Sequence, residues 1–135
     1  MSRIVPVMKL NEHVPADTNL IRRYAPSSVT IGAEELRRPC LVAAKLLVRD
    51  LRPTRVEELE LADLEPLWPL APQVLLVGTG KQLRFAPAAV RAACAERRIA
   101  VESMDLGAAC RTYNVLVQED RVVAALLFPE PEAGA

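Results

Sequence analysis

Hydrophobic and polar residues alternate along residues 40–48. One face of an extended chain would carry Cys40, Val42, Ala44, Leu46 and Val48. The other face would carry aliphatic residues together with Lys45 and Arg49. Strict alternation of this kind predicts a β-strand with one face packed against the core and the other face partly exposed to solvent. Pro53 is expected to end this region.

Residues 74–77 form a continuous apolar run, which is typical of a strand buried on both faces. Gly78, Thr79 and Gly80 follow it. Pro87 suits the first position of a helix, and residues 88–98 continue that helix with many small side chains. The next strand is expected from residue 99 to residue 105. Strand, helix and strand within about 30 residues predict a βαβ unit, whose two strands are parallel and adjacent.

The rest of the chain supplies shorter elements of both kinds. Strands are predicted at 20–24, 28–31, 34–37 and 122–128, and helices at 61–67 and 106–118. Trp68 lies among Pro66, Pro69 and Pro72; it either plugs the core beneath this turn or anchors a partner protein. The pattern predicts an α/β fold with helices packed on a β-sheet.

The length of 135 residues matches one domain. Residues 1–19 lack hydrophobic periodicity and are expected to form an irregular N-terminal arm with at most one short edge strand. Residues 20–128 are expected to form the single α/β domain. Residues 129–135 are expected to be a flexible tail.

Charge and hydropathy narrow the classes of partner. Lys and Arg total 17, equal to Asp and Glu, so the net charge is zero. Nucleic-acid binding is disfavoured because it needs a surplus of cations. No apolar run approaches the length that would insert into a membrane, and no signal peptide is evident. The expected location is the cytoplasm.

The sequence contains few of the residues and motifs that bind metals or cofactors. The three cysteines, Cys40, Cys94 and Cys110, lie far apart, and His13 is the single histidine. This set excludes a Cys/His zinc site within one chain. The Gly78–Gly80 sequence matches neither the dinucleotide fingerprint nor a P-loop. We therefore expect no metal and no cofactor.

Ligands of open α/β sheets favour the crevice beyond the carboxyl ends of parallel strands. Here that edge would be built by the loop after residue 77 and the loop after residue 104. The candidate ligand-binding residues are Gly78, Thr79, Gly80, Lys81, Arg84, Asp105, Arg111 and Asn114. The cations and free helix amides could hold a carboxylate or phosphate. The alternative is a tight turn that needs positive φ angles at glycine and binds nothing.

The helix predicted over 106–118 carries the most distinctive run. At helical spacing Arg111 and Asn114 share a face with Gln118. Arg111 opposes the helix dipole, so either a bound anion or an ion pair with Asp105 or Glu102 should favour it. Asp105 is expected to cap the helix. Cys110 is expected to be a buried structural thiol rather than a nucleophile paired with His13.

Four segments carry a family resemblance: LLVGTG at 75–80, VESMD at 101–105, AACRTYNVL at 108–116 and EDRVVAAL at 119–126. They resemble the Mth-type domain family, over about residues 21–128 and most specifically over 102–126. This family includes uncharacterised bacterial proteins, a mitochondrial respiratory complex I assembly factor and an adipogenesis-associated protein. The resemblance implies a three-layer α/β fold around a central mixed sheet. It also implies that the glycine loop and the Arg111–Asn114 motif are family features.

These observations favour a non-enzymatic binding or assembly-factor module whose partner is another protein. No catalytic residue is assigned. The alternative is a binder of, or an enzyme acting on, a small anionic molecule in the cleft at the carboxyl ends of the parallel strands. No feature of the sequence indicates an oligomeric state.

Overall fold

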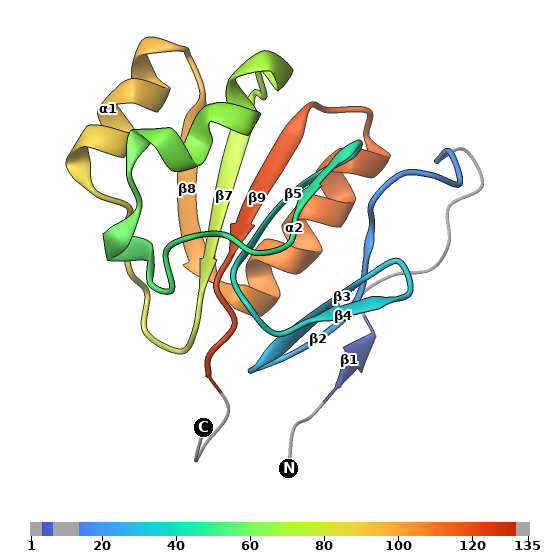
Figure 1. Ribbon diagram of the computed structural model, residues 1–135. Coiled ribbons are helices and arrows are strands. Elements are labelled where there is room, and N and C mark those ends of the chain that lie inside the picture. Colours follow the sequence, from blue (N-terminus) through green and yellow to red (C-terminus); the bar gives the residue numbers. More distant parts are fainter. Residues whose placement is uncertain (1–3, 7–13, 132–135) are drawn as a thin grey trace.

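The computed structural model describes residues 4–6 and 14–131. They form two β-sheets (Figure 1). The larger sheet has the order β6-β5-β9-β7-β8, with strands Leu46–Val48, Cys40–Ala43, Val123–Leu127, Val74–Thr79 and Ala100–Asp105. The smaller sheet has the order β1-β2-β3-β4, with strands Val5–Pro6, Ile21–Ala25, Ser28–Ile31 and Glu34–Leu36. His13 lies outside the described residues.

The predicted βαβ unit is confirmed. Strand β7 leads through helix α1 (Ala88–Glu96) to β8, and the two strands pair in parallel from Val74↔Ala100 to Thr79↔Asp105. Strand β9 lies parallel to β7 on its other side, whereas β5 runs antiparallel to β9. The sheet is therefore mixed, as expected.

The prediction of one strand over residues 40–48 is wrong. The segment is a hairpin of β5 and β6 with a two-residue turn at Ala44 and Lys45, because Ala43 pairs with Leu46. Cross-strand partners point to the same face of a sheet, so the turn shifts the alternation by one residue. The shift leaves no mark in the sequence, since both faces of this sheet are covered by apolar residues.

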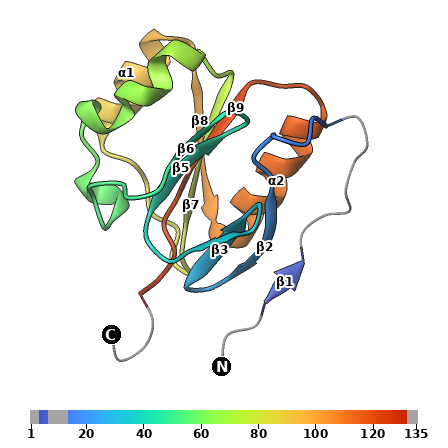
Figure 2. The ribbon, with the colours of Figure 1, turned by 45° about the vertical axis from the view of Figure 1, so that its right-hand side comes forward.

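Both faces of the larger sheet are covered (Figures 1 and 2). Helix α2 (Leu106–Gln118) and strands β2 and β3 pack on one face. Helix α1 and the 3₁₀ segments η1 (Val56–Glu58) and η2 (Leu61–Leu70) pack on the other. Strands β5, β7 and β9 send alternate residues to the two cores: Val42, Leu76 and Ala125 to the first, and Leu41, Leu75 and Ala124 to the second.

The leucine-rich segment after residue 60 is longer than predicted and is a 3₁₀ helix. Pro66 and Pro69 lie inside η2 and lack the N–H group that an α-helix would need. Glu60 and Asp63 form a capping box at its start. Trp68 packs half-buried against the second core, and the guanidinium carbon of Arg97 lies 3.9 Å from the centroid of its ring.

Candidate functional site

The carboxyl ends of β7 and β8 stand side by side, as predicted, because Gly78 pairs with Met104 and Thr79 with Asp105. Their trailing loops therefore meet at one edge of the sheet. Among the described glycines only Gly32 has a positive φ. The alternative that Gly78–Gly80 is a turn requiring positive φ is thus wrong. Close approach explains Gly78 instead, because a Cβ there would lie 2.6 Å from the Cβ of Ala109 on α2.

Thr79 organises the loop that leads from β7 to α1. Its side chain is buried, and its hydroxyl donates to the carbonyl of Gln82 at 3.1 Å and accepts from the N–H of Arg84 at 3.3 Å. Both partners belong to the loop itself. Thr79 therefore shapes the loop, and its hydroxyl is already engaged.

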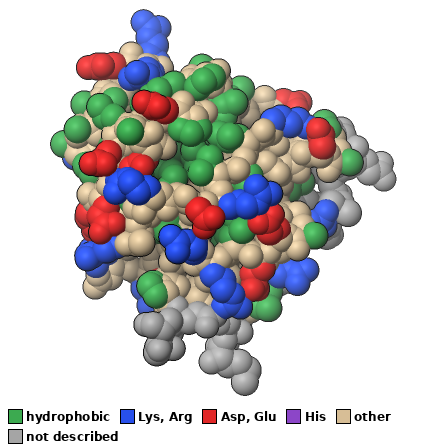
Figure 3. Space-filling view, viewed as in Figure 1, with side chains coloured by type: hydrophobic (Ala, Val, Ile, Leu, Met, Phe, Trp, Pro, Cys, Tyr) green, Lys and Arg blue, Asp and Glu red, His purple; other side chains and the backbone are tan. Residues whose placement is uncertain are grey.

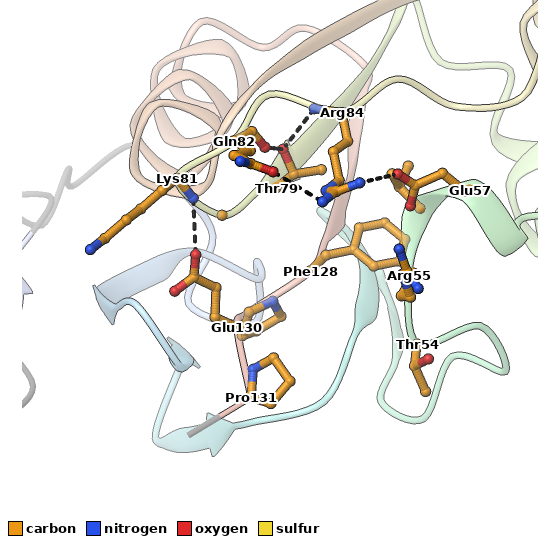
Figure 4. A pocket seen from close by; sticks show the side chains of 13 residues that line it. Thr54, Arg55, Glu57, Thr79, Lys81, Gln82, Arg84, Phe128, Glu130 and Pro131 are labelled. Atoms are coloured by element: carbon orange, nitrogen blue, oxygen red, sulfur yellow. Dashed lines mark hydrogen bonds and ion pairs between the residues drawn. The ribbon is translucent and has the colours of Figure 1, made fainter. Parts of the chain in front are cut away.

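Arg84, a predicted ligand-binding residue, is held by neighbours. Its guanidinium donates to Glu57 at 2.7 Å and to the side-chain oxygen of Gln82 at 3.0 Å (Figure 4). The Arg84 hydrogen bond lowers the pKa of Glu57. Sequence reasoning missed Glu57, which lies 27 residues away in η1 and carries no motif that pairs it with Arg84.

Asp105 has the capping role that the sequence indicated. Its Oδ1 accepts from the N–H of Ala108 at 2.8 Å, which satisfies one of the free amides at the start of α2. The residue is exposed and borders the second hollow, but this oxygen is already engaged in capping the helix.

Arg111 has a different partner from those expected. Its guanidinium donates to the Tyr24 hydroxyl at 2.6 Å, rather than pairing with Asp105 or Glu102, and its Cζ lies 6.0 Å from the centroid of the Tyr24 ring. Tyr24 belongs to β2 in the smaller sheet, 87 residues away. Arg111 thus links α2 to β2 at the surface.

We expect Arg111→Ala to lower the free energy of unfolding by about 1 kcal/mol or less, since exposed hydrogen bonds contribute little net stability. Chemical denaturation of the variant and the wild type measures the difference. The matched control is Tyr24→Phe, which removes the hydroxyl that accepts the hydrogen bond from Arg111. A loss above about 3 kcal/mol would show that Arg111 is a core structural residue.

Asn114 and Arg111 both contact β2, but Arg111 is exposed whereas Asn114 lies inside the molecule. Asn114 is buried, with its Oδ1 accepting from the N–H of Ile21 at 2.9 Å and its Nδ2 donating to the carbonyl of Ile21 at 2.7 Å. The amide joins α2 to the backbone of β2, so it is not available to a ligand in the cleft.

Cys110 is buried, as expected, and burial is the main cause that raises the pKa of its thiol to about 12. Burial likewise raises the pKa of Cys40 to about 12. Both thiols are therefore protonated at neutral pH, and neither is an activated nucleophile.

Two hollows remain at this edge of the sheet. The first has a volume of about 500 Å³ and lies between η1 and the loop that follows β7 (Figure 4). The second has a volume of about 420 Å³ and lies beside β2 and the start of α2. Gly80, Lys81 and Glu130 line both. Of the eight predicted site residues, Gly80 and Lys81 are the two that border both hollows.

Glu130 is the second residue of this edge, after Glu57, that sequence reasoning missed. It was placed in the expected flexible tail, yet its N–H donates to the carbonyl of Pro26 and its carboxylate accepts from the N–H of Lys81. Flanking Pro129 and Pro131 are the only local signal, because prolines favour an extended chain. Residues 132–135 lie outside the described part.

A family described as "Protein of unknown function (DUF498/DUF598)" matches residues 21–128. The chain belongs to this family. The match spans the predicted domain from the start of β2 to just past the end of β9.

Curated relatives of this DUF498/DUF598 protein carry the name "NADH dehydrogenase [ubiquinone] 1 alpha subcomplex assembly factor 3". The Xenopus tropicalis protein is 28% identical over 120 residues, which are 87% of this chain and 65% of the relative. The Danio rerio protein is 32% identical over 114 residues, 83% of this chain and 65% of the relative. The chain thus spans a little under two thirds of the length of these relatives.

Solved structures confirm the fold of the DUF498/DUF598 chain. A Xanthomonas campestris protein superposes with a TM-score of 0.77 at 30% identity, covering 95% of this chain and 99% of the other. A Bordetella pertussis protein described as a Mth938-like domain gives 0.75 at 23% identity, covering 93% and 94%. The resemblance to the Mth-type family is confirmed. Across the described residues, no helix is both long and apolar enough to cross a bilayer.

Proposed function

We propose that this chain is a protein-binding module that acts as an assembly factor. The observation that carries the proposal is the apolar outer side of η2, here called the η2 surface. Its half-exposed or exposed members are Leu61, Ala62, Pro66, Trp68, Pro69, Leu70 and Ala71. Figure 3 shows hydrophobic side chains gathered over the upper part of the face that η2 covers, while acidic and basic side chains mix below.

The composition of the η2 surface suits recognition of another protein. Contiguous exposed apolar patches on small proteins mark interaction sites. Trp and Arg are enriched among the residues that dominate binding energy, and on this surface the guanidinium of Arg97 lies over the ring of Trp68. Strand β6 adds half-buried Leu46 and Val48 from the same core. The names of the curated relatives as assembly factors support the same role.

The proposal is tested by photo-cross-linking in cells. A photoreactive amino acid at Leu61, which is 47% exposed, is expected to give a discrete adduct with another protein. The matched control is Val115, which is 52% exposed and lies on α2, on the opposite face of the sheet. The control position is expected to give no such adduct.

Two substitutions test the same surface by measuring the affinity for the captured protein, one on the η2 surface and one on α2. Leu70→Asp places a charge on the η2 surface and is expected to weaken the captured complex at least tenfold, because burying an unpaired charge is costly. Val115→Asp is expected to leave it unchanged. Equal adducts from positions 61 and 115, or equal loss in the two Asp variants, would contradict a specific η2 interface.

A further inference from the structure

The carboxylate of Glu130 lies against the turn that follows β7. Its Oε1 accepts from the backbone N–H of Lys81 at 3.0 Å. A Cβ at Gly80 would overlap this oxygen and would lie 2.6 Å from the Cγ of Glu130. The missing side chain of glycine is therefore what allows a carboxylate to reach the turn.

The segment that carries Glu130 is anchored on both sides of the cleft. The N–H of Phe128 donates to the carbonyl of Gly78 at 2.9 Å, and the N–H of Glu130 donates to the carbonyl of Pro26 at 2.9 Å. We call residues 128–131 the strap. The strap crosses the edge where β7 ends and reaches the turn between β2 and β3, so it holds the carboxylate in place.

The two hollows meet at the Gly80–Lys81 turn, where Glu130 lines both. The hollows of about 500 Å³ and about 420 Å³ share Gly80, Lys81 and Glu130 as lining residues. Shortening Glu130 is therefore expected to widen the space that the two hollows share beside the Lys81 amide. Each hollow by itself has a volume in the range of small-molecule sites.

Charged side chains of both signs line the first hollow. Its lining includes Arg55, Lys81 and Arg84 as cations and Glu57 and Glu130 as anions. Arg84 is paired with Glu57 at 2.7 Å. Arg55 lies close enough to Glu57 and Glu58 for its charge to contribute to lowering the pKa of both carboxyl groups. Replacing Glu130 by a neutral residue would remove one of the two anions of this lining and leave Glu57, which is paired with Arg84.

We propose that the Gly80–Lys81 turn is a carboxylate-binding site, which Glu130 occupies in the free protein and which a carboxylate ligand takes by displacing it. The ligand carries an apolar body, since Val56, Phe128, Pro129 and Pro131 line the first hollow. This proposal does not depend on the η2 surface. Either the carboxylate site or the η2 interface can therefore be disproved without the other.

The test is a titration of ¹⁵N-labelled protein with glutarate, followed through the amide signals of Gly80 and Lys81. Glu130→Ala is expected to show saturable shifts of both amides and an apparent Kd at least tenfold lower than that of the wild type. Glu130→Gln, which keeps the shape but loses the charge, should fall between them. Glu119→Ala removes an exposed acid at the end of α2 and is expected to bind like the wild type.

Two further arms identify the source of the carboxylate. Tighter binding of acetyl-Pro-Glu-Pro-amide than of glutarate would assign the site to an acidic segment of a polypeptide, and the reverse order to a small dicarboxylate. Sodium chloride at matched ionic strength is expected to shift neither amide. Binding of glutarate no tighter to Glu130→Ala than to the wild type, or equal shifts with chloride, would overturn the proposal.

Discussion

Replacing Asn114 by alanine is expected to lower the free energy of unfolding by about 3 kcal/mol, because the loss leaves buried polar groups unpaired. The amide of Asn114 accepts from the N–H of Ile21 and donates to its carbonyl, and both residues are buried. Alanine cannot form either hydrogen bond, so the N–H and the carbonyl of Ile21 lose their partner on α2 and no new partner replaces it.

Equilibrium unfolding in urea measures the effect, and two variants sharpen it. Gln118→Ala changes a half-buried amide one turn further along α2 and is expected to cost less than about 1 kcal/mol. Asn114→Asp keeps an acceptor for the N–H of Ile21 but lacks the donor for its carbonyl, so it should also be strongly destabilising. If Asn114→Ala costs no more than Gln118→Ala, the two hydrogen bonds are not a major source of stability.

The βαβ unit could be predicted because its signals are local. The apolar run at 74–77 marks a strand buried on both faces, and Pro87 marks the start of α1. The hairpin at Ala44–Lys45 could not be predicted in the same way. Both faces of the larger sheet are apolar, so a shift in the alternation has no compositional trace.

The position of the candidate site could be predicted, and so could the capping contact of Asp105, but most other contacts of its residues could not. The loops after β7 and β8 meet as expected because parallel neighbouring strands end at one edge. However, Asn114 is buried although it is polar, since the backbone of β2 satisfies its amide. The hydrogen-bond partner of Asn114 is Ile21, which is 93 residues away. Helical periodicity carries no information about such a distant partner.

The partners of the cations show the same limit. Arg84 pairs with Glu57 across 27 residues, Arg111 with Tyr24 across 87, and the Lys81 amide with Glu130 across 49. Each contact depends on how loops from different elements come together. Residue type alone indicated that cations gather at this edge, but their partners are set by the tertiary fold.

Replacing Gly78 by alanine is expected to lower the free energy of unfolding by about 2 kcal/mol through overpacking. A Cβ at this position would lie 2.6 Å from the Cβ of Ala109, 3.3 Å from Cδ2 of Leu127 and 3.4 Å from Cα of Leu106. The Leu127 side chain can rotate away, but the Cβ of Ala109 is fixed to the backbone of α2. Helix α2 must therefore move away from β7, which disturbs the first core.

A double-mutant cycle separates this steric cause from a general intolerance of β7 to substitution. Ala109→Gly alone is expected to cost about 1 kcal/mol, because glycine is a poorer helix former. The same change removes the atom that the new Cβ would strike, so Gly78→Ala combined with Ala109→Gly should cost less than the sum of the two single changes by about 2 kcal/mol. Urea unfolding of the four proteins measures this coupling. Additive losses would show that close approach of α2 to β7 is not the reason for glycine at position 78.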